Sequence, residues 1–269
     1  MKELFKFLGQ SESKPRFIGL IAGICISIFA WWLIAVFEVV PDKILPNPVH
    51  VVKCIPSLFI NNNLLWNIGY TISLNAVGYI IALTISIPLG FLIGSFDCFD
   101  GFRKIFNGLR YLPIPVITGL FIAGLGLGFM MKSSFLAFGL LIYILPAVIN
   151  AVHNMNNPMN PEEYVLISAA RCLNLTNWNI FSKVVWKHVM PKVYDEICSL
   201  TAISYTYVTI AENLNKEGGI GAMINIFNRQ TLIPEVYACL IIIVFIGICQ
   251  DILLKRFKGI LFPFIKSAK

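Results

Sequence analysis

Long uncharged stretches, separated by short charged segments, dominate the pattern of this chain. The longest uncharged run extends from 54 to 96, and another, 17–37, follows a basic N-terminal segment. About 20 apolar residues in a helix cross the hydrocarbon core of a bilayer. The 17–37 run is too long for a signal-peptide core, so we expect a retained transmembrane helix. The pattern predicts six spans, at about 17–40, 64–96, 112–131, 135–152, 197–211 and 236–254.

The connecting segments contain the prolines, many of the glycines and most of the charges. LPNP at 45–48 precedes an amphipathic stretch that predicts a short helix on the outer surface, and 213–235 predicts an outer loop able to pack a short helix. We expect 97–111 to be a charged loop and 132–134 a turn. Glycines at 124–128 favour either close helix packing or a broken, re-entrant piece.

Composition indicates an integral membrane protein. The chain is 57% hydrophobic and 13% charged, with a mean hydropathy of +0.77, whereas a soluble domain has about 25% charged residues. In lipid every backbone polar group needs an internal partner, so the spans should be helices and the fold all-α. The net charge of +7 is scattered among the spans, a pattern of membrane topology and not of nucleic-acid binding.

The distribution of basic residues predicts the orientation. With both termini inside, 16 of the 21 Lys and Arg residues lie on the cytoplasmic side, as the positive-inside rule requires. We therefore expect a cytoplasmic segment at 1–16, a membrane domain at 17–254 and a basic cytoplasmic tail at 255–269. Residues 1–16 are interpreted either as a helix on the inner membrane face or as a frayed tail.

Residue patterns typical of catalysis, metal binding and nucleotide binding are lacking. The seven cysteines form no CxxC pair, and the three histidines, His50, His153 and His188, have no metal-binding spacing. No phosphate-binding GxxxxGK[ST] loop occurs. We therefore expect no metal, no cofactor and no enzymatic activity in this chain.

The segment 164–193 differs from the rest of the chain because it is amphipathic and basic. It predicts two short helices with a bend near Asn174, and the second, from about Asn177, should stop at Pro191 because proline cannot donate a helical hydrogen bond. One interpretation is a hairpin that docks on a soluble partner. The other is an interfacial helix with its apolar side in lipid and Lys183 and Lys187 on head groups.

Several motifs in order resemble those of ABC importer permeases. The family pattern opens with Glu-Ala-Ala, which Ala169 and Ala170 match, whereas Ser168 replaces the Glu. Asn174 stands where Gly is expected, and Pro191 matches a later proline. The resemblance extends to further segments, which are similar to those of the branch that carries sulfonates, taurine, nitrate, bicarbonate and related nutrients. These segments are LPNP at 45–48, 71–94, 109–128 and 211–224. The departures Ser168, Asn174 and Lys187 put the strength of coupling in question.

The resemblance implies a six-span, MetI-like type I importer permease in the inner membrane with a cytoplasmic coupling hairpin. Its implied partners are two ATP-binding subunits, a second permease (the same chain or a sister chain) and an extracytoplasmic substrate-binding protein. We hypothesise that apolar residues of the second hairpin helix anchor it in a groove of the ATPase. The coupling residues expected are Ser168, Ala169, Ala170, Arg171, Leu173, Asn174, Trp178, Ile180, Phe181, Lys183, Val185 and Pro191.

A polar stripe on the fifth span predicts a face turned to the bundle interior or to a water-filled path. The candidates for the translocation path are Asn75, Tyr205, Tyr207, Thr209 and Glu212. The same side chains could instead form hydrogen bonds between helices. The centres of the expected spans are nearly free of ionisable residues. A stand-alone secondary transporter or channel is the alternative function, and it would normally require ionisable residues there.

Overall fold

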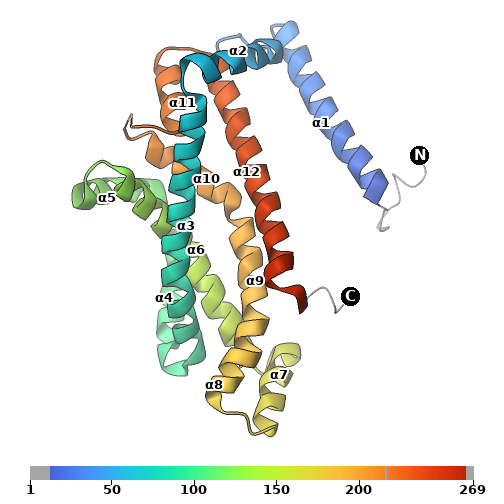
Figure 1. Ribbon diagram of the computed structural model, residues 1–269, viewed down its shortest axis with the longest axis vertical. Coiled ribbons are helices and arrows are strands. Elements are labelled where there is room, and N and C mark those ends of the chain that lie inside the picture. The colour runs from blue at the N-terminus through green and yellow to red at the C-terminus, as the bar shows by residue number, and fades with distance from the viewer. Residues whose placement is uncertain (1–12, 216, 265–269) are drawn as a thin grey trace. The chain divides into compact units, whose positions relative to one another are not determined.

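The computed structural model describes residues 13–215 and 217–264, in which every regular element is helical (Figure 1). The predicted terminal segments therefore lie partly outside the described residues. The helices are α1 (Ser13–Val36), α2 (Pro48–Asn61), α3 (Leu64–Ser95), α4 (Asp100–Gly108), α5 (Thr118–Leu125), α6 (Phe129–Met155), α7 (Pro161–Cys172), α8 (Asn177–Asn179), α9 (Trp186–Ser199), α10 (Thr201–Glu212), α11 (Ile220–Arg229) and α12 (Ile233–Leu261).

The chain divides into two compact units. The first comprises Met1–Leu64 and Ile224–Ile241, and the second comprises Leu65–Met223 and Ile242–Lys269. In the first unit the Trp31 indole donates a hydrogen bond to the Pro46 carbonyl, 3.1 Å away, and the ring centroids of Trp31 and Tyr237 are 5.9 Å apart. These contacts fix the proline-rich segment that precedes α2.

The start of α2 shows why a helix follows the LPNP segment. The Asn47 side chain accepts a hydrogen bond from the Val49 backbone N–H, and Pro48 occupies the first helical position. Asn is a preferred N-cap residue, and proline at this position gives up no helical hydrogen bond. The short helix predicted after 45–48 is thereby confirmed.

Three helices are long and apolar enough to cross a membrane: α3, α6 and α12. They confirm the spans predicted at 64–96, 135–152 and 236–254. A fourth is added if the bent pair Asp97–Tyr111 and Ile114–Leu125 counts as one span. The six-span count, and the placement of both termini inside, stay predictions.

The third predicted span, 112–131, is wrong as a single helix. A 3-10 turn, Ile114–Ile117, leads into α5, which ends at Gly126 with a φ of 71°. This left-handed conformation is accessible to glycine at little cost, so the chain can turn there before α6 begins. The glycine-rich stretch thus provides the break that was one of its two expected roles.

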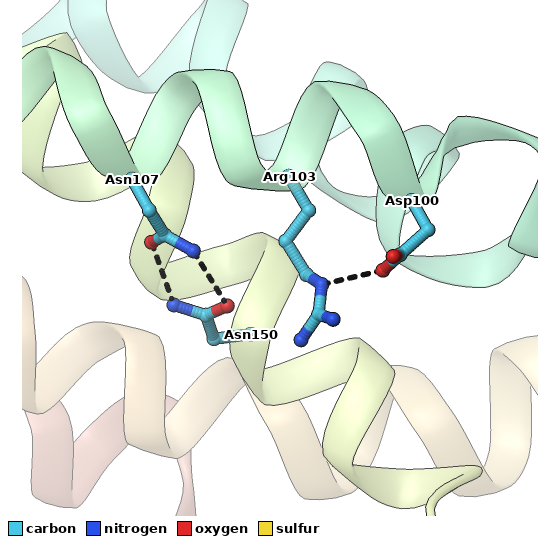
Figure 2. Close-up of polar contacts among 4 residues, drawn as sticks. All are labelled: Asp100, Arg103, Asn107 and Asn150. Carbon is cyan, nitrogen blue, oxygen red and sulfur yellow. Dashed lines mark hydrogen bonds and ion pairs between the residues drawn. The ribbon is translucent and has the colours of Figure 1, made fainter.

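The predicted charged loop at 97–111 is also wrong, because most of it is helical. Asp100 and Arg103 form an ion pair one turn apart, with 2.7 Å between the Arg103 Nε and the carboxylate. Asn107 of α4 and Asn150 of α6 exchange two hydrogen bonds through their side-chain amides (Figure 2). The reciprocal amide pair holds α4 against α6, and that tertiary contact is invisible in the local sequence.

The expected turn at 132–134 lies instead inside α6. Lys132 is fully buried, and its ammonium group is 3.2 Å from the Tyr70 hydroxyl and 3.5 Å from the Glu217 carboxylate. Lys132, expected in a turn outside the spans, is thus part of a candidate span, near its first turn. A buried ammonium ion is tolerated when a counter-charge and hydrogen bonds replace its hydration, as these partners do.

Glycines of α3 allow α6 to pack closely beside it. A Cβ at Gly90 would lie 2.6 Å from the Val148 side chain, and one at Gly94 would lie 2.8 Å from the Ile149 carbonyl oxygen. The two glycines are four residues apart, the small-residue spacing that brings membrane helices into close contact. Gly78 faces Leu136 in the same way, so α3 and α6 run parallel over most of their length.

Helix α10 packs along α6 in the opposite direction. The ring of Tyr207 lies against Gly139, where an added Cβ would be 2.7 Å from it, and contacts Phe135 edge to face. Since α6 is a candidate span, α10 lies at the same depth even though it is shorter and more polar. Its polar groups must therefore find partners within the bundle.

The carboxylate of Glu212, fully buried at the end of α10, joins three segments. It accepts hydrogen bonds from the Thr71 hydroxyl and from the Gly221 backbone N–H, both at 2.8 Å. The Ile220 N–H donates in turn to the Thr71 oxygen, 3.0 Å away. Glu212 thus places an acceptor at the N-terminus of α11, where a negative charge is favourable.

The loop before α11 is shaped by two glycines with positive φ. Gly218 has a φ of 150° and Gly219 a φ of 102°. The Gly219 N–H donates to the Asn67 side chain at 2.8 Å. An added Cβ would overlap the Trp66 ring at Gly218 and the Glu212 carboxyl group at Gly219. The backbone here approaches its neighbours too closely for any other residue.

We expect the substitution Glu212→Ala to lower the unfolding temperature in detergent. It leaves the Thr71 hydroxyl and the Gly221 N–H without their acceptor, at a cost of about 1–3 kcal/mol for each buried group. Glu162→Ala, which removes an exposed carboxylate at the start of α7, should cost under about 1 kcal/mol. Equal unfolding temperatures for the two variants would contradict the role given to Glu212.

Replacement of Gly219 by Ala should also destabilise the protein, by about 1–3 kcal/mol of backbone strain in addition to the steric overlap with Glu212. Gly101, inside α4, offers a matched control because an added Cβ meets nothing within 4 Å. Gly101→Ala should be neutral or slightly stabilising, since alanine favours a helix interior. Thermal unfolding monitored by circular dichroism in detergent compares the two, and a Gly219→Ala variant as stable as Gly101→Ala would be inconsistent with this packing.

Candidate functional site

The segment predicted as a hairpin is composed of α7, a short turn, α8, a π-helical segment Ile180–Val185, and α9. Helix α7 packs against α6 and against the π-helical segment. Figure 1 shows α7 and α8 joined by the turn, with α9 leading away from them towards α10. The two-helix hairpin is thus confirmed as a structural element, and α9 connects it directly to the bundle.

The bend of the hairpin lies where the sequence predicted it. Asn174 has a φ of 53°, the left-handed conformation that Gly and Asn adopt most easily. Its N–H donates to the Arg171 carbonyl at 2.9 Å. The Thr176 side chain accepts a hydrogen bond from the Asn179 N–H and begins the second helix. Asn174 therefore supplies the left-handed residue that the bend requires.

The second helix does not stop at Pro191, contrary to the prediction. Helix α9 continues through Pro191 to Ser199, and α10 follows after Leu200. Pro191 is buried together with Val189 and Val193, and the two valines belong to the core that α6 also enters. The burial of this apolar face outweighs the loss of one backbone hydrogen bond. The hairpin and the fifth predicted span are consequently one almost uninterrupted helical path.

Contacts of α9 with two other elements hold that path in place. Lys192 forms an ion pair with Glu163 of α7, and Lys258 of α12 forms one with Asp195 at 2.5 Å. The Tyr194 hydroxyl donates to the Leu254 carbonyl, 3.0 Å away. These polar contacts tie α9 both to the first half of the hairpin and to the second half of α12.

One titratable group on this helix is partly withdrawn from water. Burial lowers the pKa of His188, and the neighbouring Lys192 lowers it further, against the opposing effect of Glu163. The imidazole is therefore held neutral at physiological pH, which suits its place on a packed face.

The structure separates the predicted coupling residues into an outward and an inward group. Leu173 and Trp178, at the turn, are the large apolar side chains that remain exposed, by 73% and 72%. The inward group packs against the bundle, where Phe181 meets Phe91 edge to face at 5.4 Å. Exposed are Ala169, Arg171, Leu173, Asn174, Trp178 and Lys183; partly or fully buried are Ser168, Ala170, Ile180, Phe181, Val185 and Pro191.

The five candidates for the translocation path all have partners within the chain. Asn75 donates to the Ser204 hydroxyl at 3.0 Å, and the Tyr205 hydroxyl donates to Gln250 at 2.6 Å. Thr209 bonds to the carbonyl one turn earlier. Tyr207 packs on α6, and Glu212 belongs to the loop network described above. Their role in a path stays a prediction.

Sequence reasoning missed residues that pack beside the hairpin and beside the candidate path residues. Phe91 of α3 and Trp186 of the hairpin stack with ring centroids 5.1 Å apart, a contact between segments far apart in the chain that the local sequence does not predict. Lys132 was visible as a charge, yet its position beside two serines suggested a turn. Only the packing of α6 against Tyr70 and Glu217 reveals it as a buried cation.

Comparisons with known proteins agree with this architecture. Residues 86–267 match the model of the family described as "Binding-protein-dependent transport system inner membrane component". The putative aliphatic sulfonates transport permease protein SsuC of Bacillus subtilis is 24% identical over 83% of this chain and 79% of its own length. The nitrate import permease protein NrtB of Synechocystis is 26% identical over 93% of this chain and 90% of its own.

A solved structure shows the same fold. It is an inward-facing conformation of the MetNI methionine ABC transporter, and its matched chain has a TM-score of 0.58 and 18% identity. The match covers 72% of this chain and 94% of that one. Since the family match extends over more than half of the residues, the chain belongs to the inner-membrane components of binding-protein-dependent transport systems, the multi-pass permease subunits of ABC importers.

Proposed function

We propose that this permease subunit forms the path for a small solute whose import is driven by ATP hydrolysis on a partner. Two ATP-binding subunits would dock on the cytoplasmic hairpin 164–193. A second permease would complete the path, and most simply it is another copy of this chain. An extracytoplasmic binding protein would deliver the solute. The observation that carries the proposal is the exposed apolar turn of the hairpin, connected through α9 to α10.

The arrangement of the hairpin supports docking and transmission of movement. Leu173 and Trp178 offer apolar surface to a partner, since aromatic residues often anchor such interfaces. Phe181 and Val185 pack inward and attach the hairpin to the bundle. Because α9 continues almost directly into α10, a displacement at the turn would reach Tyr205, Tyr207 and the Glu212 network along one helical path.

We propose a small oxyanion as the solute, because the printed names of two relatives specify aliphatic sulfonates and nitrate. The buried ammonium of Lys132 is already neutralised by Glu217. The path would therefore depend on hydroxyl groups and low-affinity passage. Uptake of ¹⁵N-nitrate and of a ³⁵S-labelled alkanesulfonate by cells with and without this chain tests the solute class; unchanged uptake of both would exclude these two.

Co-purification tests the central proposal. The tagged chain, expressed with a candidate ATP-binding subunit from the same organism, should retain that subunit in detergent, and the complex should hydrolyse ATP. The chain alone should not. A chain that purifies alone and catalyses transport in liposomes without any ATPase would overturn the proposal.

Trp178→Asp should release the ATP-binding subunit while the permease still inserts in the membrane. An aromatic anchor at an interface contributes about 2 kcal/mol or more, and 1.4 kcal/mol corresponds to tenfold in affinity. We therefore expect at least about tenfold weaker binding by pull-down titration, and a matching loss of uptake. Trp178→Phe, which keeps an apolar ring, should retain most binding. Normal uptake by Trp178→Asp would argue against docking at this turn.

The bend gives a second test that adds no charge. Asn174→Gly should leave transport unchanged, because glycine adopts a φ of 53° without strain. Asn174→Val should reduce uptake, since a β-branched residue in this conformation costs about 1–3 kcal/mol and favours another geometry of the turn. Equal uptake by the two variants would show that coupling does not depend on this backbone conformation.

One observation favours the alternative of a stand-alone transporter. Lys132, Glu212 and Tyr70 bring ionisable groups together inside the bundle, and such groups mark ion-coupled pathways in carriers. Under that alternative Lys132→Met should abolish ion-gradient-driven uptake by the isolated chain in liposomes. An absence of any gradient-driven uptake by the unaltered chain would remove this alternative.

A further inference from the structure

A cavity of about 780 Å³ opens between the hairpin and the C-terminal ends of α3 and α6. Its wall is mainly apolar, and its aromatic part consists of Phe91, Trp178, Phe181 and Trp186. Neighbouring rings of this group are in contact, with centroids 5.1 to 5.6 Å apart. The volume and the apolar lining are those of sites that bind small ligands.

The position of the cavity in the fold indicates its surroundings. Its walls include the last turns of α3 (Ile87–Phe96) and residues at the end of α6 (Val152–Met155), and both helices are candidate membrane spans. The topology expected from the basic residues, with both termini inside, puts these ends on the cytoplasmic side. The cavity therefore lies at the level where the inner leaflet meets the cytoplasm, and aromatic residues are frequent at that depth.

A cation stands at the rim of this otherwise apolar cavity. Arg171, the last basic residue of α7, lines it together with Asn156 and Asn177. One guanidinium nitrogen donates to the Asn156 side chain at 3.2 Å. Within the described part of the chain no carboxylate is within 4.0 Å of Arg171. A guanidinium has five N–H donors, so most of them remain available to a ligand.

The backbone beside the cavity is also unusual. Ile180–Val185, whose residues Ile180, Phe181 and Val185 line the wall, is a π-helical segment. Such segments are rare, because their geometry is less favourable than that of an α-helix, and they occur often at functional sites. Within this segment Phe181 meets Phe91 edge to face, with ring centroids 5.4 Å apart.

We propose that this cavity binds one acyl chain of an anionic phospholipid, with the lipid phosphate held by Arg171. The apolar aromatic wall fits the hydrocarbon chain. The rim fits the head group, since arginine binds phosphate oxygens with two parallel hydrogen bonds. Anionic lipids of the cytoplasmic leaflet are attracted to basic residues at this depth. This inference goes beyond the proposed function and does not depend on it.

The bound chain would fill the space between the hairpin and the bundle. It would pack on Phe181 and Trp186 of the hairpin, beside the ring of Trp178, which lines the same cavity. The lipid would thereby support the hairpin against α3 and α6. Loss of the lipid would leave an apolar cavity open to water at the interface.

Native mass spectrometry and fluorescence quenching test the site on the full-length chain in detergent. Added phosphatidylglycerol should be retained in one saturable copy per chain, and phosphatidylcholine more weakly. Phosphatidylglycerol brominated on its acyl chains should quench tryptophan fluorescence at the same concentration. This quenching should be lost in the double variant Trp178→Phe, Trp186→Phe, which retains the three tryptophans at 31, 32 and 66.

Arg171→Gln should raise the half-saturating concentration of phosphatidylglycerol about tenfold, the effect of one lost charge-assisted contact. Lys187→Gln is the matched control, because it removes an exposed charge from the same hairpin without lining the cavity. It should change the value less than about twofold. Ser95→Phe, which places a ring in the opening, should weaken binding without removing any charge.

Three results would overturn the proposal. Equal losses for Arg171→Gln and Lys187→Gln would indicate general attraction of anionic lipid to the hairpin. Equal quenching by brominated phosphatidylcholine or brominated dodecylmaltoside would indicate that the cavity accepts any apolar chain. No saturable lipid at all, with the variants folded by size-exclusion chromatography, would assign the cavity to a protein segment.

Discussion

The contact between α3 and α6 is the one on which most of the second unit depends. Gly78, Gly90 and Gly94 remove the side chains that would hold these helices apart, and Leu136, Val148 and Ile149 enter the space. In lipid, where apolar burial drives association weakly, such close van der Waals packing is a main source of helix–helix affinity. With α6 fixed on α3, the surfaces that receive α10, α4 and the hairpin are all determined.

The two ends of this helix pair carry different chemistry. At the N-terminal end of α6, Lys132 and the neighbouring Glu212 network combine buried charge with backbone donors of a glycine loop. At the C-terminal end, aromatic rings and the single cation of Arg171 surround an open cavity. The first end is closed by hydrogen bonds that are costly to break in a medium of low polarity. The second encloses an open space beside the hairpin.

The helical path from α8 to α10 connects these ends. It contains a π-helical segment and a proline, either of which could be expected to interrupt it, yet it continues because its apolar face is buried along α6. Ion pairs of Lys192 and Asp195 hold its middle to α7 and α12. The path therefore connects the exposed turn at Trp178 to the buried carboxylate of Glu212 through nearly continuous helix.

The sequence by itself determined the membrane class, three of the spans and the hairpin with its bend. The physical reason is that bilayer thickness sets the length of an apolar run, and a left-handed bend restricts the residue, here Asn174, to a few types. Family resemblance added the importer class. These are local constraints, each readable from neighbouring residues.

Only the tertiary structure decided the elements whose partners are far away in the chain. Most of the stretch 97–111 is helical, and the side-chain amide of Asn107 pairs with that of Asn150. Lys132 belongs to a helix because Tyr70 and Glu217 are the partners of its ammonium group. Helix α9 continues through Pro191 because that face is buried against α6. The cavity under the hairpin likewise needs three separate segments. Long-range packing and counter-charges override the local signals for a loop, a turn or a helix end, since in a bilayer a buried polar group is stable only with its partner in place.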